Sequence, residues 1–495
     1  MSVLERNQSQ PKGLYLLFFT ELWERFGFYM VQTILVLYMS KGLGYTDGGA
    51  YLLYGAFTSM LFLTPVVGGY IADRLIGFSQ SIIIGGLLFI LGYGIMAFES
   101  EKALFLGLSI VIIANGFFKP NVSSLVGELY HTGDPRRDGG FTIFYMGINL
   151  GALMPPLFAG AIVSAYSWSF GFSIASLGMA ISLLTFVFGK KKLGPIGGMP
   201  TVSPLHKSKV MKTIFYLGLF SAICLLILLF QILFHYPKEA DIILIFASIA
   251  IFMAVLFFLF KESPHQRKRL FACLILILIS VGFWAFYNQT FTSLMLFADR
   301  NMSKQFLGFT IDAEFTQFFN PFFIILLSPI LSRLWIRLDA KGLDPSTPTK
   351  FSLGILFMAI GFLVLGAGTR YFSVDGEASP WWLVTSYFLE TVGELLLSPI
   401  GLAMVTKLSP RHLVGMMMGV WFLTQSAAFA IGGGLATLSD VPKGVVGSMS
   451  LMIYTHAFLV YGAISLTLAA LSFALVPYLK YLIGHPHDPI PTPKQ

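Results

Sequence analysis

Two carboxylates and a guanidinium stand close together inside the first long apolar stretch of the chain, as Glu21, Glu24 and Arg25. Residues three and four apart share one face of a helix, so these groups form a compact charged patch. An ionised group near a bilayer centre costs on the order of 2.5–3.5 kcal/mol, so such groups normally face a protein interior or a water-filled path. Two acids beside one base can hold or release a proton while the arginine stays charged. The patch therefore indicates proton handling within a membrane.

Further polar groups lie inside other apolar stretches. Lys119 stands directly before Pro120, and a buried ammonium needs a partner or an anionic ligand. Glu390, Glu394 and Ser398 follow one another at intervals of four residues, which places them on one helix face. The chain thus carries a cation in its first half and carboxylates in its second, both at membrane depth.

The elements that position these groups are predicted to be membrane-spanning helices. Of 495 residues, 56% are hydrophobic and only 11% are charged, whereas soluble domains average about 25% charged residues. A soluble fold would lack polar surface at this composition. Cys224 and Cys273 each lie in an apolar run, and they indicate neither a metal site nor a disulfide framework.

About 14 apolar stretches are long enough to cross a bilayer, for which a helix needs about 20 residues. The predicted spans are residues 14–40, 50–72, 78–98, 103–128, 141–165, 168–189, 213–234, 241–260, 270–297, 307–336, 351–369, 381–406, 413–437 and 449–478. Basic residues collect in alternate loops, at residues 136–137, 190–212, 261–269, 333–350 and 407–411. By the positive-inside rule we expect these loops and both termini to be cytoplasmic.

The spans divide into two six-helix halves around a central pair that has almost no charge. We expect an N-terminal bundle in residues 1–189, a cytoplasmic linker, accessory helix pair and following loop in residues 190–269, and a C-terminal bundle with a tail in residues 270–495. The central pair is interpreted as lipid-facing. The amino terminus lacks the apolar core of a cleaved signal peptide. The predicted fold class is an all-α polytopic membrane protein.

Five motifs resemble those of known transporters. The turn at residues 69–77, GYIADRLIG, is similar to the signature loop of the major facilitator superfamily. Residues 21–26 (ELWERF), 117–121 (FFKPN), 141–153 (FTIFYMGINLGAL) and 393–399 (GELLLSP) together resemble the proton-dependent oligopeptide transporter (POT) family of that superfamily, in its bacterial form. The resemblance covers nearly the whole chain. It implies the major facilitator fold, with two six-helix bundles and two extra central helices.

The resemblance also implies a function, a proton-coupled symporter that imports di- and tripeptides by alternating access. Lys119 would engage the peptide carboxylate, and Glu394, with Ser398 close by, would bind the peptide amino group. Proton coupling would involve Glu21, Glu24, Arg25, Lys119 and Glu394. Two alternatives stay open: Lys119 could form a structural ion pair with Glu21 or Glu24, and Glu390 could be a second proton site or a helix-packing partner.

By the same resemblance, the other residues of the peptide pocket are Tyr29, Tyr145, Asn149, Trp284, Asn320 and Trp421. Tyrosine and asparagine could bond the peptide backbone, while aromatic rings would form side-chain pockets that tolerate many residues. A lone Trp or Tyr in a membrane helix is more often a packing residue or an interface anchor, which is the alternative interpretation. Pro321 is expected to break or kink the helix beside Asn320.

The chain departs from the family pattern at its outer gate. Many members carry an arginine near the position of Gln32 and an acid near that of Asn288, and these form an ion pair between the halves. Here both residues are neutral, which costs less than leaving one charge unpaired. A Gln32–Asn288 hydrogen bond could replace the ion pair. Phe62 also stands where the family has a pocket tyrosine.

Other functions were considered beside the peptide symporter. The nearest is a family relative that carries nitrate, another small anion or a peptide-like drug, but an acid at position 394 favours a ligand with an amino group. A receptor or an uncoupled channel would bind peptide without proton-dependent accumulation. An intramembrane enzyme is not expected, because the 8 histidines do not cluster in the spans. Protons as coupling ion, no cofactor and no metal are expected. The expected partners are peptides and the lipid bilayer, and no nucleic acid is expected. We expect the protein to work as a monomer in a bacterial inner membrane.

Overall fold

The computed structural model describes residues 9–484, apart from residues 132–133, 135, 202, 207, 261 and 411–412. Both chain ends, and the basic positions 207, 261 and 411 of the predicted cytoplasmic loops, lie outside the described residues.

The described chain is almost entirely helical. Its first part contains α1 Lys12–Leu37, η2 Tyr38–Gly42, α2 Asp47–Ile71, η3 Ala72–Ile76, α3 Phe78–Met96, α4 Glu101–Glu128, α5 Arg137–Leu153, η4 Pro155–Leu157, α6 Ala159–Ala165, α7 Trp168–Gly189, η5 Lys190–Leu193 and η6 Pro204–His206. Then follow α8 Lys209–His235, α9 Pro237–Leu259, α10 Pro264–Tyr287, η7 Asn288–Phe291, α11 Ser293–Asn301, β1 Gln305–Phe306, β2 Phe309–Thr310, η8 Ala313–Phe318, α12 Phe319–Ala340, α13 Thr347–Tyr371, α14 Pro380–Leu408, α15 Val414–Ala436, η9 Thr437–Ser439 and α16 Ser448–Ile483. β1 and β2 form a small antiparallel hairpin.

Several helices begin at a hydroxyl residue, which satisfies a backbone N–H that has no partner within the helix. Thr46 accepts a hydrogen bond from the Gly49 N–H at the start of α2. Ser100 does the same at α4, where it accepts from Ala103. These caps fix where α2 and α4 start after the preceding polar turns.

The helices match the predicted polytopic membrane protein. Within the described residues, 13 helical segments are long and apolar enough to cross a membrane. The remaining long helix, α1, carries the predicted charged patch of Glu21, Glu24 and Arg25, and counting it gives the fourteen spans that the sequence predicts.

Three predicted spans differ in detail from the structure. The span predicted over residues 270–297 is interrupted by the 3-10 segment η7 between α10 and α11. The span predicted over residues 141–165 is interrupted at Pro155 and Pro156, where α5 gives way to the short η4 and then α6, because proline cannot donate the helical hydrogen bond. The span predicted over residues 307–336 begins too early, since residues 309–310 belong to the β-hairpin and α12 starts only at Phe319.

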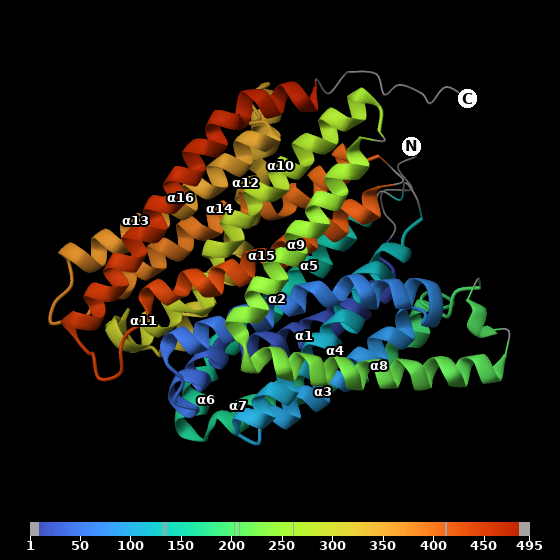
Figure 1. Ribbon diagram of the computed structural model, residues 1–495, viewed down its shortest axis with the longest axis horizontal. Helices are drawn as coiled ribbons and strands as arrows, with labels where there is room; N and C mark the ends of the chain where they lie inside the picture. Colours follow the sequence, from blue (N-terminus) through green and yellow to red (C-terminus); the bar gives the residue numbers. More distant parts are fainter. Residues whose placement is uncertain are drawn as a thin grey trace.

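The helices gather into two bundles, as Figure 1 shows. In the first, α1 packs on α5 and α7, and α3 packs on α4. In the second, α13 packs on α14 and α16. The bundles meet most extensively where α2 of the first packs along α15 of the second. In Figure 1 they lie close together at the left, near α6 and α11, and spread apart toward the right.

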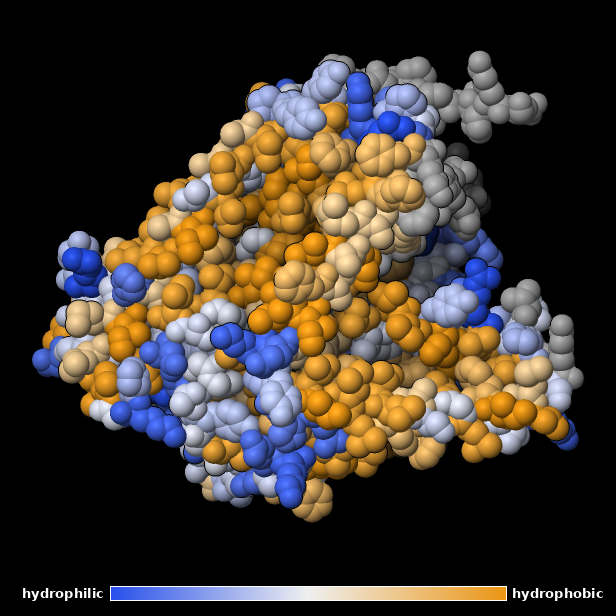
Figure 2. All heavy atoms as spheres, in the orientation of Figure 1, coloured by the Kyte–Doolittle hydropathy of each residue, from blue (hydrophilic) through white to orange (hydrophobic). Residues whose placement is uncertain are grey.

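The accessory pair lies outside the bundles. α8 packs on α4, whereas α9 packs on both α2 and α15 and so contacts both halves. Only 11% of the apolar window of α8 and 22% of that of α9 are buried, which fits helices that face lipid. Figure 2 shows a broad hydrophobic band across this face of the molecule, with hydrophilic side chains gathered at opposite ends.

Candidate transport site

The charged patch of α1 is fully inside the first bundle. Glu21, Glu24 and Arg25 are 3%, 1% and 3% exposed. The Arg25 guanidinium forms a two-point ion pair with the neighbouring Glu24, and its Nε lies 3.5 Å from Oε1 of Glu21. The second oxygen of Glu21 has no hydrogen-bond partner among the described residues. The patch therefore holds one saturated acid and one acid with a free oxygen.

Lys119 points toward this patch from α4 without pairing to it. The ammonium is close enough to Glu21 and Glu24 to interact with their charges. Within the part of the chain that the structure describes, however, no carboxylate lies within the 4.0 Å of an ion pair. Its Nζ instead lies 5.1 Å from the centre of the Phe62 ring. The predicted direct ion pair with Glu21 or Glu24 is thus absent here, and the cation can accept an anionic ligand.

Glu394 of α14 is held by a network within the second bundle. Asn320 donates from Nδ2 to the carboxylate at 2.8 Å and to the Thr391 hydroxyl at 3.2 Å. Tyr287 in turn donates its hydroxyl to Oδ1 of Asn320, at 3.3 Å. The carboxylate is only 8% exposed, yet its partners are all neutral.

Of the break or kink expected beside Asn320, the structure has a break. Pro321 does not kink a continuous helix, because it stands in the first turn of α12, where a backbone N–H would have no helical partner in any case. The irregular backbone precedes it as the 3-10 segment η8. Asn320 consequently projects from a helix start beside Glu394.

Three tyrosines lie near Glu394. Tyr29, Tyr145 and Tyr287 are each close enough to Glu394 to interact with its charge. Tyr29 also interacts with Arg25 on its own helix. Because Tyr29 and Tyr145 come from the first bundle and Tyr287 from the second, the tyrosines bring both halves to one location. Tyr287 was not among the predicted site residues.

The remaining predicted pocket residues differ in their surroundings. Asn149 is buried and donates from Nδ2 to the Tyr145 carbonyl, at 2.9 Å. Trp284 packs edge-on against Tyr287, with ring centres 5.2 Å apart, and its indole N–H has no partner among the described residues. It is therefore a free donor next to the Glu394 network.

Ser398 and Trp421 lie further along α14 and α15. Ser398 is half-buried one turn beyond Glu394. Trp421 is only 2% exposed, and its ring covers Gly401 so closely that a Cβ there would overlap it. In this conformation the Trp421 environment is that of a packing residue, which was the alternative interpretation.

Glu390 sits one turn before Glu394 and is deeper. It is 1% exposed and accepts a hydrogen bond from the Ser386 hydroxyl, at 2.8 Å. Its own helix thus supplies a partner. Within the described residues no group of three or more His, Cys, Asp or Glu side chains could hold a metal ion.

The two neutral residues of the predicted gate do not bond to each other. Gln32 donates to the Tyr54 hydroxyl at 2.7 Å, within its own half. Asn288 packs against Gly432, and both polar atoms of its amide lack a hydrogen-bond partner among the described residues. The suggested Gln32–Asn288 hydrogen bond is therefore absent in this conformation.

Other charged residues, which no local sequence pattern indicates, join the halves. Arg300 pairs with Asp47 through both terminal nitrogens of its guanidinium, and Nη2 lies 2.8 Å from Oδ1 of Asp47. Asp47 also accepts from the Val441 N–H at 3.3 Å. Lys41 pairs with Asp299 at 2.6 Å. These residues lie at the ends of α1, α2 and α11 where the bundles converge, on the side opposite to the start of α1.

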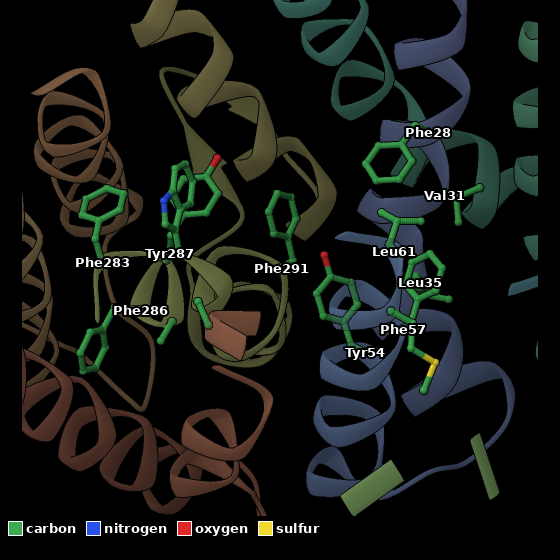
Figure 3. Packing of buried hydrophobic residues seen from close by; sticks show 14 of the residues in the cluster. Phe28, Val31, Leu35, Tyr54, Phe57, Leu61, Phe283, Phe286, Tyr287 and Phe291 are labelled. Atoms are coloured by element: carbon green, nitrogen blue, oxygen red, sulfur yellow. The ribbon is translucent and has the colours of Figure 1, made fainter. Parts of the chain in front are cut away.

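Small and aromatic residues continue this closure along α2 and α15. A Cβ at Gly55 would come within 2.9 Å of the Gly433 Cα. Next along α2, Ser59 donates to the Ser426 carbonyl at 2.7 Å. Figure 3 shows how rings from the two halves approach at this interface, where Tyr54 of α2 stacks on Phe291 with ring centres 6.2 Å apart.

The fold and the site define a class of protein. Within the described residues, twelve membrane-crossing helices form two bundles that converge at one end, and the accessory pair lies outside them. This is the architecture of a membrane transporter of the major facilitator fold. A sequence model of the POT family matches residues 79–452, and the chain belongs to that family.

Relatives and solved structures agree over nearly the full length. Dipeptide and tripeptide permease B of Edwardsiella piscicida is 37% identical, covering 97% of both chains. The protein of that name from Salmonella typhimurium is 36% identical, covering 96% of this chain and 97% of its own. A crystal structure of a POT peptide transporter mutant in complex with alafosfalin has a TM-score of 0.83 at 34% identity, covering 95% of this chain and 96% of its own.

Proposed function

We propose that this protein is a proton-coupled symporter that imports di- and tripeptides by alternating access. The relatives named dipeptide and tripeptide permease B support the substrate class. The observation that carries the proposal is that the two halves hold opposite charges. Lys119 of the first half has an ammonium with no ion-pair partner among the described residues, and Glu394 of the second half has a buried carboxylate.

The two charges suit the ends of a peptide. A free di- or tripeptide is a zwitterion, with a carboxylate for Lys119 and an ammonium for Glu394. Charge-assisted hydrogen bonds are about twice as strong as neutral ones. Since the two residues belong to different halves, a ligand that bridges them stabilises the state in which the halves approach each other. Tyr29 and Tyr145, which lie near Glu394, would bond the peptide backbone.

The other pocket residues would shape the space for side chains. We assign peptide contacts to Tyr29, Lys119, Tyr145, Asn149, Trp284, Asn320, Glu394, Ser398 and Trp421. The indole N–H of Trp284 has no partner in the part of the chain that the structure describes. Trp421 would reach a ligand only after a change in its packing on Gly401. Gln32 and Asn288 would act at the outer gate through packing, since their amides do not pair.

Proton coupling is assigned to Glu21, Glu24, Arg25, Lys119 and Glu394. Protonation in the α1 patch would lower its net negative charge and so change the pull of Glu21 and Glu24 on Lys119. The free oxygen of Glu21 is the favoured proton acceptor of the patch, because both oxygens of Glu24 are engaged by Arg25. A membrane potential supplies roughly 2.3 kcal/mol per charge per 100 mV, so one proton can drive accumulation.

Alternating access would follow from rocking of two units, residues 1–189 and 270–495, with residues 190–269 as linker, accessory pair and following loop. The contacts of Asp47, Arg300, Lys41 and Asp299 close the end opposite to the start of α1. We take the start of α1, with the basic loops, as the cytoplasmic side. The protein would then face inward, in a bacterial inner membrane, and would work as a monomer because one chain supplies both halves of the site.

The experiment that tests the substrate class is competition. Purified protein in liposomes would take up labelled dialanine in the presence of unlabelled dialanine, trialanine, N-acetyl-dialanine, dialanine amide or nitrate. We expect the two free peptides to compete and each blocked peptide to compete far less, since each lacks one charged end. Strong competition by nitrate with none by free peptides would instead indicate an anion carrier. Equal competition by N-acetyl-dialanine would contradict the role of Glu394.

A further inference from the structure

Three side chains from three helices form a continuous contact between the lysine and the other half of the protein. The Lys119 ammonium of α4 lies over one face of the Phe62 ring, 5.1 Å from its centre. The other partner of Phe62, on α2, is Phe429 of α15, whose ring stacks nearly parallel, with centres 4.9 Å apart and planes 7° apart. We call Phe62 and Phe429 the aromatic bridge.

The bridge occupies a particular place in the interface. Along α2, the contacts with α15 run from Gly55, packed on Gly433, through Ser59, bonded to Ser426, to Phe62. Phe62 is the furthest of these from the closed outer end of α2. It is thus the point at which the closed interface meets the charges of the first bundle.

We propose that the aromatic bridge transmits the state of Lys119 to the outer interface between the halves, with Phe62 and Phe429 as positioning residues for coupling. This inference rests on the proposed symport function. A protonated lysine over the ring holds Phe62 in the orientation that stacks on Phe429. The stack in turn belongs to the conformation in which α2 and α15 are closed.

The physical basis is that an ammonium is attracted to a ring face and a neutral amine is not. Charged groups that act on Lys119 are Glu21, Glu24 and Arg25, all on α1. When the negative charge of the deprotonated α1 patch, or a peptide carboxylate, draws the ammonium away from the ring, Phe62 loses one of its two partners. Parallel stacking depends on ring orientation, so the closed interface weakens by about threefold to tenfold in population, the usual size of one cation–π contact.

The absence of a hydroxyl on Phe62 is part of this device. A tyrosine at this position could hydrogen-bond the ammonium or a ligand at its ring edge. Phenylalanine offers Lys119 only its face, so the contact depends on charge alone. In the sequence, the only indication of the aromatic bridge is that Phe62 departs from the family pattern.

The matched control is a second stack between the halves that has no cation. Tyr54 and Phe291 stack across the same interface, with ring centres 6.2 Å apart, and Tyr54 bonds to neutral Gln32. Phe291→Leu therefore removes stacking area between the halves without touching Lys119. A purely structural role of the bridge predicts the same behaviour for Phe62→Leu and Phe291→Leu.

The test reads the outer interface directly and needs no transport. Spin labels on cysteines at Phe98 and Val446, exposed residues of the first and second halves, would report the outer distance in a background of Cys224→Ser and Cys273→Ala. We expect the parent and Phe291→Leu to show pH-dependent outer distances. Phe62→Leu, Phe429→Leu and the double variant should lose that dependence to the same extent.

Transport then separates this inference from the proposed function. In liposomes, Phe429→Leu should exchange labelled dialanine across the membrane within about twofold of the parent, yet lose most proton-driven accumulation. A parent that never accumulates peptide would refute the symport proposal, while the distance measurement would still decide on the bridge. The bridge is contradicted if pH has no effect on the parent distance, or if Phe62→Leu and Phe291→Leu behave alike.

Discussion

Asn320 donates a hydrogen bond from its amide to the carboxylate of Glu394, with Nδ2 and Oε2 2.8 Å apart. The amide oxygen of the same Asn320 accepts from Tyr287. Both partners belong to the second bundle, so the acid is oriented before any ligand arrives. A preset carboxylate loses less conformational freedom when it binds an ammonium group.

Removing this donor should weaken peptide binding. In Asn320→Leu, the buried Glu394 loses its hydrogen bond, which typically costs about 1–3 kcal/mol. We expect the affinity for dialanine, measured by calorimetry on purified protein, to fall by roughly fivefold to a hundredfold. Thr391→Val removes only the second, longer bond of the same amide and should stay within about twofold. Equal losses in the two variants would show that the Asn320–Glu394 bond has no special role.

Neutralising the acid itself should act on one end of the ligand. Glu394→Gln keeps the shape of the side chain and removes its charge, and a hydrogen bond to a charged group contributes about 1.5–3 kcal/mol. We therefore expect dialanine affinity to fall at least tenfold while N-acetyl-dialanine, which has no ammonium, binds about as weakly to the variant as to the parent. A similar loss for both ligands would place Glu394 outside the amino-end contact.

The outer closure should depend on Asp47 and Arg300. Asp47 is 3% exposed and Arg300 28% exposed, so removing one partner leaves a partly buried charge, at a cost of about 1–3 kcal/mol to the closed state. Asp47→Asn or Arg300→Gln should increase labelling of a cysteine at the outer interface, and the double variant should increase it less than the sum. Lys41→Gln is the control, because the Lys41 side chain is 51% exposed and exposed pairs contribute about 0–1 kcal/mol. Labelling that rises equally in all variants would refute a specific Asp47–Arg300 closure.

The sequence predicts most of the membrane-spanning helices and several site residues, because local patterns of apolar and charged residues determine where such helices form. The apolar stretches, the charged face of Glu21, Glu24 and Arg25, and Lys119 at membrane depth were all visible without a structure. The patterns are strong because lipid tolerates only helices whose backbone groups are paired internally. The two prolines Pro155 and Pro156 also indicate a helix interruption, but the apolar residues around them favoured the prediction of one continuous span.

The contacts between the halves could not be predicted in the same way. Asp47 and Arg300 are ordinary charged residues near helix ends, and nothing in either local sequence indicates the other. The same holds for Ser59 with Ser426 and for Phe62 with Phe429. Such pairs depend on how two bundles dock, which no helical period encodes. Tyr287 was missed for a related reason, because its hydroxyl acts through Asn320 on another helix.

The proton site can be separated from the peptide site by one substitution. Glu21→Gln removes the acid with a free oxygen but leaves the Glu24–Arg25 pair intact. We expect counterflow exchange of labelled dialanine to continue, because exchange needs no net proton movement. Accumulation driven by a proton gradient should be lost. Loss of exchange as well as accumulation would instead indicate that Glu21 holds the fold or the ligand.

The most direct test of the central claim is uphill peptide uptake. Purified protein in liposomes would be given an inward proton gradient and a negative-inside potential, with labelled dialanine outside. One proton per peptide across 100 mV can support about 50-fold accumulation. We expect accumulation above the outside concentration that collapses with a protonophore and is absent in Glu394→Gln. Uptake that only equilibrates the peptide, with or without the gradient, would contradict proton-coupled symport.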